Sequence, residues 1–288
     1  MKLSELYKKQ KPGLSFEIFP PKRDSFLSDI EPTLEIMADL HPDYIGITFG
    51  AGGSVANNKT IEIARLIKEK YHVEPMVHMT CLNYNKADID EYASMMVEYG
   101  IDNCLALRGD RREGEEPKKD FAYASELTAY LKSKWDFCIA GGCYPEGHPE
   151  CGSRKKDMDN LKLKVDAGDE LLISQLFLDN EFFYDFKKGL DERGINIPVT
   201  PGIMPVINSA QFERMSSLCG ASIPARFRRI MDRYEDDPDA LFDAGLYYMT
   251  SQVIDLIASG TDGIHLYTMN RPSVAKRLAE AIHNIIIP

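Results

Sequence analysis

Short apolar runs alternate with amphipathic stretches along the whole chain. The short runs are bounded by turn residues, as buried strands are, whereas apolar residues in the longer stretches recur at helical spacing. Strands are predicted at 14–21, 44–51, 73–81, 104–107, 137–144, 171–178, 197–205 and 263–269. Helices are predicted at 24–40, 59–70, 86–99, 121–132, 154–167, 181–193, 209–219, 239–259 and 273–287.

Eight strand–helix units predict an α/β fold, a (β/α)8 TIM barrel, with residues 1–288 forming a single domain. A doubly wound open sheet is the alternative. Against it, no G-x-G-x-x-G follows the first strand and no P-loop is present. The Arg- and Asp-rich segment 223–239 is expected to be an extra helical insertion before the last strand.

Composition narrows the class of protein. The chain is 44% hydrophobic and 27% charged, which suits a soluble protein with a sizeable core. Its net charge of −11 argues against nucleic-acid or anionic-membrane binding, although a local basic patch could still hold an anionic small molecule. No apolar segment approaches the roughly 20 residues that span a bilayer. The first eleven residues do not resemble a secretory signal, and the six cysteines have no zinc or iron–sulfur spacing. We therefore expect a cytoplasmic protein without a metal site.

The stretch Asn103–Asp110, N-C-L-A-L-R-G-D, places a charged pair directly after an apolar strand. Gly109 allows the backbone to turn sharply there. In parallel α/β folds ligands bind at the carboxyl ends of the strands, so Arg108 and Asp110 are candidate site residues. A surface ion pair that closes the strand is the alternative.

Other predicted strands also carry polar residues. Glu17 lies among aromatic residues in F-E-I-F-P-P, an environment that favours a protonated carboxyl and suits a general acid. The alternative is that Glu17 simply faces solvent. Thr48 is a further hydrogen-bonding candidate, His78 is either a core histidine or a functional one, and Gln175 needs a polar partner if it is buried.

The segment after the fifth strand adds two groups. Tyr144 and His148 lie in Y-P-E-G-H-P, where a metal site with Glu146 is conceivable but lacks further ligands. Asp157, Asn160 and Lys164 share one face of the next helix. That face is either plain solvent-exposed surface or, with Ser153, Arg154 and Lys155 in the first turn, part of a phosphate site.

Together these stretches resemble the methylenetetrahydrofolate reductase family, in the form of its bacterial catalytic barrel. The matching segments, in order, are F-E-I-F-P-P, I-T-F-G-A, H-M-T-C, A-L-R-G-D, Y-P-E-G-H-P, N-L-K-L-K-V-D-A-G, Q-L-F-L-D, P-G-I-M-P and Y-T-M-N-R. The resemblance implies a flavoprotein of one-carbon metabolism that uses noncovalent FAD at the barrel mouth. It implies reduction of 5,10-methylenetetrahydrofolate to 5-methyltetrahydrofolate with electrons from NAD(P)H, by ping-pong hydride transfer.

The resemblance also implies residue roles. Glu17 matches the general acid, Asp110 the carboxylate beside the flavin and pterin, and Gln175 a residue shared by the folate and nicotinamide sites. Gln211 and Arg271 match folate-contacting positions. The positions that match FAD contacts are Thr48, Ala51, His78, Arg108, Gly109, Asp110, Tyr123, Ala124, Tyr144, His148, Asp157, Asn160 and Lys164.

Two positions depart from the family pattern. Leu163 replaces an arginine near the end of the helix motif, so one phosphate contact is either missing or supplied by Arg154 or Lys155. Met215 replaces a phenylalanine that packs on the nicotinamide, which leaves the electron donor open between NADH, NADPH and a partner protein. The enzyme is expected to be a homo-oligomer. The alternatives are a flavin-binding subunit of a larger reductase, or a metal-assisted barrel lyase or hydrolase that uses His78 and His148.

Overall fold

The computed structural model describes residues 1–8, 12–21, 27–49, 57–111, 116–205 and 209–286. The strands are β1 (Gly13–Ile18), β2 (Tyr44–Ile47), β3 (Glu74–Thr80), β4 (Asn103–Leu107), β5 (Cys138–Cys143), β6 (Leu171–Ser174), β7 (Val199–Thr200), β8 (Gly202–Ile203) and β9 (Gly263–Tyr267). The helices are α1 (Leu3–Leu6), α2 (Glu31–Ala38), α3 (Asn57–Tyr71), α4 (Lys86–Glu98), α5 (Ala124–Lys134), α6 (Arg154–Ala167), α7 (Asn180–Asp191), α8 (Ser209–Cys219), α9 (Ala225–Arg233), α10 (Pro238–Ala258) and α11 (Pro272–Ile286). Two 3-10 turns are η1 (Leu27–Asp29) and η2 (Pro149–Cys151).

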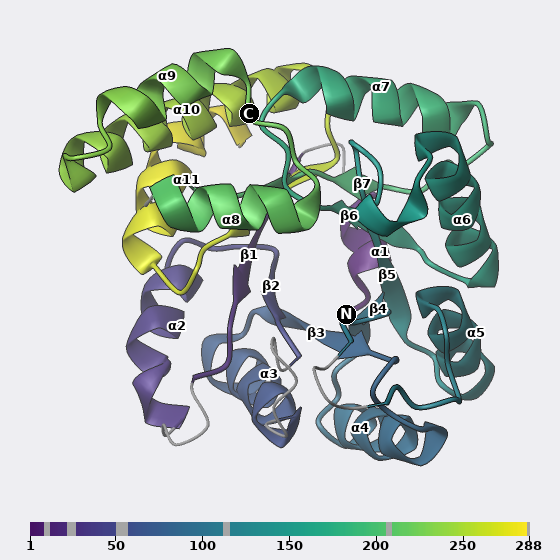
Figure 1. Ribbon diagram of the computed structural model, residues 1–288. Helices are drawn as coiled ribbons and strands as arrows, with labels where there is room; N and C mark the ends of the chain where they lie inside the picture. The colour runs from purple at the N-terminus through teal and green to yellow at the C-terminus, as the bar shows by residue number, and fades with distance from the viewer. Residues whose placement is uncertain (9–11, 22–26, 50–56, 112–115, 206–208, 287–288) are drawn as a thin grey trace.

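The strands form one parallel sheet in the order β7-β6-β5-β4-β3-β2-β1-β9-β8. β7 and β8 are two halves of one strand, separated by Pro201 alone. β7 pairs with β6 and β8 pairs with β9, so residues 199–203 close the sheet into a ring. The predicted (β/α)8 barrel is thereby confirmed, and Figure 1 shows the helices arranged around the strands.

Alternation along each strand divides the core into two layers, because successive side chains point to opposite faces of a sheet. On β1, Phe16 and Ile18 pack outward against the helices, whereas Glu17 faces the barrel interior. On β4, Cys104 and Ala106 point outward and Leu105 points inward. The predicted apolar runs therefore contain the few inward positions that can carry polar chemistry.

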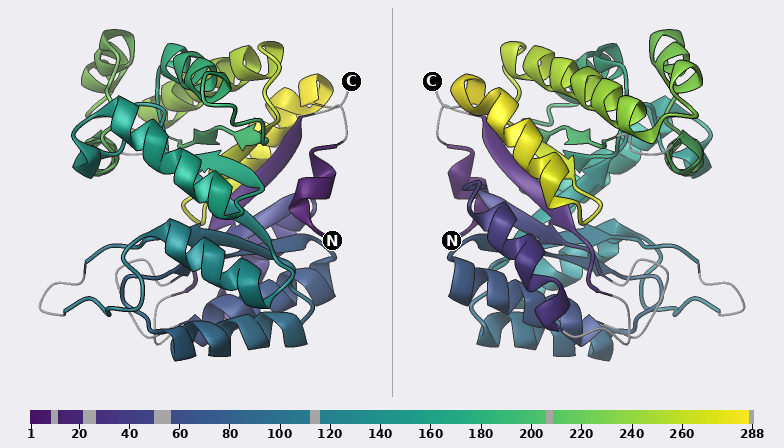
Figure 2. Two further views of the ribbon diagram at one scale, coloured as in Figure 1. Left: turned by 90° about the vertical axis from the view of Figure 1, so that its right-hand side faces the viewer. Right: turned by 90° about the vertical axis from the view of Figure 1, so that its left-hand side faces the viewer.

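The short helix α1, which the sequence analysis did not predict, closes the amino-terminal end of the barrel. Leu3 and Leu6 are buried against inward-facing side chains near the amino-terminal ends of the strands, such as Met76 and Leu171. The Leu3 N–H donates to Asn103 Oδ1 at 2.8 Å, at the start of β4. Figure 2 shows α1 next to the N-terminus at one end of the barrel.

The insertion predicted before the last strand contains α9. It packs with α8 and the first part of α10 around a separate small cluster: Leu178, Phe212, Phe227, Met231 and Leu241. Asp237 caps α10 by accepting from the Ala240 N–H at 3.0 Å. None of the helices in the described ranges is long and apolar enough to span a bilayer.

Several predicted boundaries were wrong. The strand predicted at 197–205 is interrupted, because Pro201 has no N–H to donate to a neighbouring strand. The strands predicted at 44–51 and 171–178 end sooner, at Ile47 and Ser174, where the chain leaves the ring for the mouth loops. In the described part of the helix predicted at 24–40, a 3-10 turn precedes α2, which begins at Glu31.

Candidate active site

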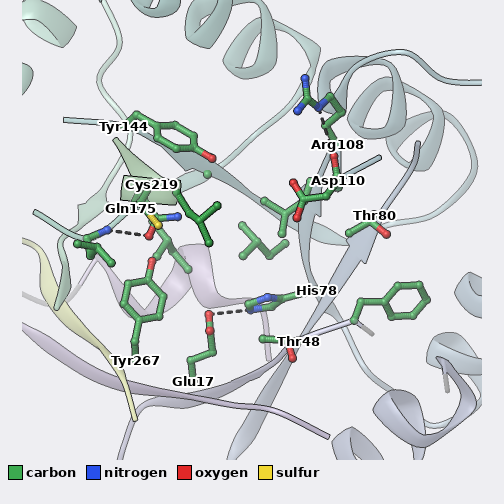
Figure 3. A pocket seen from close by; sticks show the side chains of 18 of the residues that line it. Glu17, Thr48, His78, Thr80, Arg108, Asp110, Tyr144, Gln175, Cys219 and Tyr267 are labelled. Atoms are coloured by element: carbon green, nitrogen blue, oxygen red, sulfur yellow. Dashed lines mark hydrogen bonds and ion pairs between the residues drawn. The ribbon is translucent and has the colours of Figure 1, made fainter. Parts of the chain in front are cut away.

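A cavity of about 860 Å³ lies at the carboxyl ends of the strands. It is lined by polar side chains from several strand ends and by apolar side chains from α8 (Figure 3). Predicted site residues that line it are Glu17, Thr48, His78, Arg108, Gly109, Asp110, Tyr144, His148, Gln175 and Met215. Residues that are far apart in the sequence are thus brought to one cavity.

Glu17 lies deep in this cavity, with 11% of its side chain exposed. Its Oε2 is 3.7 Å from His78 Nε2 and 3.5 Å from His265 Nε2. Burial lowers the pKa of His78 to about 4, although the nearby charge of Glu17 opposes this shift. His78 is therefore neutral near pH 7, and its approach to Glu17 is a polar contact rather than an ion pair.

His265 was missed as a site residue. It is fully buried on β9, and its Nδ1 lies 2.8 Å from the hydroxyl of Ser15. The signal was a histidine inside the apolar run G-I-H-L-Y, the same pattern that drew attention to His78. The register that pairs Ser15 with His265 across β1 and β9 cannot be read from the sequence.

The end of β4 has the sharp turn that the sequence predicted. Gly109 has a φ of +81°, and a Cβ at that position would lie 2.9 Å from the Cβ of Thr80. Both the backbone conformation and the lack of space require glycine. Arg108 forms a two-point ion pair with Glu150, at 2.6 and 3.0 Å, and the exposed Asp110 follows.

The loop after β5 contributes Tyr144 and His148, whose rings pack edge to face with centroids 4.5 Å apart. Burial raises the pKa of Tyr144 to about 12. Asp157 accepts from the His148 N–H at 3.0 Å, and Lys164 donates to the carbonyl of Gly142. From α6, Asp157 therefore supports the loop that lines the cavity, and Lys164 holds the end of β5.

Other predicted site residues lie outside the cavity lining. Asn160 donates to Cys151 Sγ at 3.5 Å, and Tyr123 is 64% exposed just before Ala124, the first residue of α5. Arg271 is exposed immediately before α11, and Leu163 is 59% exposed on α6. Ala51 and the side chain of Gln211 lie outside the described residues.

Gln175 is half-buried and has a polar partner in the neighbouring backbone. Its Oε1 accepts from the N–H of Leu176 at 2.9 Å. Beside it, Tyr267 donates from its hydroxyl to the carbonyl of Ser174 at 2.7 Å, linking β9 to β6 across the cavity. Tyr267 was not predicted as a site residue, although it belongs to the motif Y-T-M-N-R.

All six cysteines are free thiols. Among the described residues there is no group of three or more His, Cys, Asp or Glu side chains that could hold a metal ion. His78 and His148 do line the same cavity.

The fold and the site define a (β/α)8-barrel protein with a ligand-sized, partly polar cavity at its mouth. The family model described as methylenetetrahydrofolate reductase matches residues 2–283. The chain therefore belongs to the methylenetetrahydrofolate reductase family.

Relatives agree with this assignment. The 5,10-methylenetetrahydrofolate reductases of Pectobacterium carotovorum and Escherichia coli are each 32% identical to this chain, and each match covers 94% of this chain and 90% of the relative. An Arabidopsis thaliana methylenetetrahydrofolate reductase (NADH) is 34% identical, over 93% of this chain and 48% of the plant protein. The chain thus spans about half the length of the plant relatives that it matches.

A solved structure shows the same fold. A Clostridium thermocellum protein, described as binding two copies of 5-methyl-5,6,7,8-tetrahydrofolic acid, superposes with a TM-score of 0.70 and 14% identity. The match covers 98% of this chain and 99% of that protein. At this identity the likeness concerns the fold alone.

Proposed function

We propose that this protein reduces 5,10-methylenetetrahydrofolate to 5-methyltetrahydrofolate with FAD as the cofactor and NAD(P)H as the electron donor, all within one barrel domain. Family membership supports the reaction class. The observation that carries the proposal is that Glu17 of β1 and Asp110 after β4 line one cavity. The two carboxyl groups that the reaction needs are therefore available to one bound substrate.

Unpaired polar atoms in the cavity wall support the binding of a polar ring system such as FAD. Thr48 Oγ1 and His78 Nε2 are buried and have no hydrogen-bond partner in the described part of the chain. Buried polar atoms are usually paired, so a ligand with donors and acceptors at its edge fits here. When bound, FAD would supply hydride transfer.

The proposed FAD contacts extend from the cavity wall to α5 and α6. Arg108 and Gly109 would approach the cofactor at the end of β4, where glycine leaves the backbone accessible. The remaining proposed contacts are Thr48, Ala51, His78, Asp110, Tyr123, Ala124, Tyr144, His148, Asp157, Asn160 and Lys164.

Glu17 is proposed as the general acid. Its carboxyl group would give a proton to the substrate nitrogen whose bond to the bridging methylene carbon breaks. The five-membered ring then opens to an iminium ion, whose carbon can accept a hydride. The neutral His78 beside Glu17 adds no positive charge to this part of the cavity wall.

Asp110 and Gln175 are proposed to bind the pterin portion of the substrate, Asp110 as a hydrogen-bond acceptor. A carboxylate at this position would also disfavour negative charge on a reduced ring beside it, which makes that ring a stronger hydride donor. Gln211 and Arg271 are proposed to contact the remainder of the folate, since Arg271 could meet a carboxylate in a two-point contact.

The experiment is anaerobic stopped-flow spectroscopy of the purified protein. We expect bound FAD that is bleached by NADH or NADPH in one half-reaction and reoxidised by 5,10-methylenetetrahydrofolate in the other. Protein that binds no flavin, or whose reduced flavin is not reoxidised by the folate, would refute the proposal.

Met215 lines the cavity, at the position where the family resemblance implies a nicotinamide-packing phenylalanine in some members. Bound FAD that the folate reoxidises, but that neither nicotinamide reduces, would instead favour a subunit that receives electrons from a partner protein.

A further inference from the structure

Residues 268–271, between β9 and α11, form a turn with two consecutive left-handed residues. Met269 and Asn270 both have a φ of 54°. Asparagine tolerates this conformation, whereas a methionine adopts it rarely. Such backbone strain persists where surrounding contacts hold it. Here the turn is held against the end of β1.

The side-chain amide of Asn270 pairs with both backbone groups of Phe19. Its Nδ2 donates to the Phe19 carbonyl at 2.9 Å, and its Oδ1 accepts from the Phe19 N–H at 2.8 Å. Two residues earlier, the hydroxyl of the fully buried Thr268 donates to the carbonyl of Glu17 at 2.6 Å. Three side-chain hydrogen bonds from one turn, together with the Thr268 N–H that donates to the Glu17 carbonyl at 3.4 Å, therefore fix the backbone at Glu17 and Phe19.

The sequence of β1 explains why a side chain serves here. The ladder between β1 and β9 ends at the pair Glu17–Tyr267. Phe19 is followed by Pro20 and Pro21, which have no N–H and cannot extend a ladder. The amide of Asn270 takes the place of the next backbone partner and holds Phe19 where the regular pairing stops.

From this geometry we propose that Asn270 is a positioning residue for the proposed acid Glu17. The inference rests on the proposed function. Glu17 reaches the cavity from β1, and Asn270 holds the backbone just after the carboxyl end of that strand. Both Phe19 and Met269 line the same cavity. Because a displacement of about 1 Å at a reacting group can cost about a hundredfold in rate, loss of this anchor would slow the step that uses Glu17.

The test compares Asn270→Gly, Asn270→Asp and a control. Glycine keeps the left-handed conformation and removes both hydrogen bonds, whereas aspartate keeps an acceptor for the Phe19 N–H and loses the donor. His72→Gly is the matched control, because His72 is exposed, has the same φ of 54°, and precedes β3 at the opposite end of the barrel.

We expect Asn270→Gly to slow reoxidation of reduced FAD by 5,10-methylenetetrahydrofolate by about ten- to a hundredfold. Flavin reduction by the donor should stay close to that of the wild type. In Asn270→Asp, the rate of reoxidation by the folate should lie between the rates of wild type and Asn270→Gly. His72→Gly should change neither half-reaction. An Asn270→Gly variant that slows both half-reactions equally, or neither, would overturn the proposal.

Hydrogen exchange separates this inference from the proposed function. The amide of Phe19 should exchange faster in Asn270→Gly than in wild type and should be unchanged in His72→Gly, whatever substrate the protein uses. Slow exchange retained in Asn270→Gly would overturn the inference. If wild-type protein lacks folate reductase activity but Phe19 exchange accelerates, the proposed function fails while the anchoring of β1 stands.

Discussion

At the scale of single residues, Glu17 is a nearly buried carboxyl group beside two imidazoles. We predict that Glu17→Gln keeps FAD bound and keeps flavin reduction by the donor, because glutamine has nearly the same shape. Folate reduction should fall by about 10²- to 10⁴-fold, the usual contribution of a general acid. Stopped-flow measurement of each half-reaction checks this. Loss of flavin from the variant, or an unimpaired folate half-reaction, would contradict the assigned role.

Asp169 gives a prediction about stability. It is 4% exposed; its Oδ1 accepts from Thr128 Oγ1 at 2.9 Å, and its Oδ2 has no partner among the described residues. A Cβ on Gly141 would lie 1.9 Å from that oxygen, so glycine makes room for the carboxyl. Burial raises the pKa of Asp169 to about 6, against the opposing effects of Lys164, Thr128 and Lys132.

Since an unfolded aspartate has a pKa of about 3.9, the folded state holds this proton more tightly. The stabilisation is fully present below about pH 4 and is lost as the pH rises through about 6, by on the order of 3 kcal/mol. Asp169→Asn should remove this part of the pH dependence. Urea unfolding from pH 4 to 8 measures it, and Asp166→Asn, at an exposed carboxylate, is the control. Identical pH profiles for wild type and Asp169→Asn would refute the prediction.

Site residues that follow a strand end were easier to predict from the sequence than site residues inside a strand. Arg108, Gly109 and Asp110 were predicted to turn at the carboxyl end of a strand, and they do. His265 was not predicted, because its meeting with Glu17 depends on the register between the first and last strands. A register is set by the whole ring rather than by any local pattern.

At the scale of elements, α1 is predicted to stabilise the barrel without taking part in its chemistry. Leu3 is fully buried beneath the ring. Leu3→Ala should lower the free energy of unfolding by about 2–5 kcal/mol, as cavities in packed cores do. Leu163→Ala, at a 59% exposed leucine, should change it by about 0.5 kcal/mol or less. Chemical denaturation of the two variants is the measurement, and equal effects would contradict the packing role of α1.

Helical and strand periodicities predicted the order of the barrel elements, because each must bury one face. The helix α1 escaped prediction because four residues are too few to show a period. Leu3, Leu6 and the C-cap residue Tyr7 do have helical spacing, but only over this single turn. The division into β7 and β8 was missed because V-T-P-G-I has no charged residue to mark a break, although its proline was visible.

At the scale of the whole molecule, α1 closes one end of the barrel interior and the proposed active site lies at the other. A folate and a nicotinamide would therefore compete for one cavity and occupy it in turn. We predict that initial rates with both substrates varied give parallel double-reciprocal lines, as a ping-pong mechanism requires. Intersecting lines would show that both substrates bind together.

The short strands on either side of Pro201 affect where the molecule begins to unfold. Each has two residues and pairs with its neighbour over two residue pairs, against four pairs between β5 and β6. Local opening costs less free energy than global unfolding, and it should begin where the fewest residues are paired. The barrel would thus open first at residues 199–203, where β7 and β8 connect β6 to β9, while the sheet from β1 to β6 stays assembled.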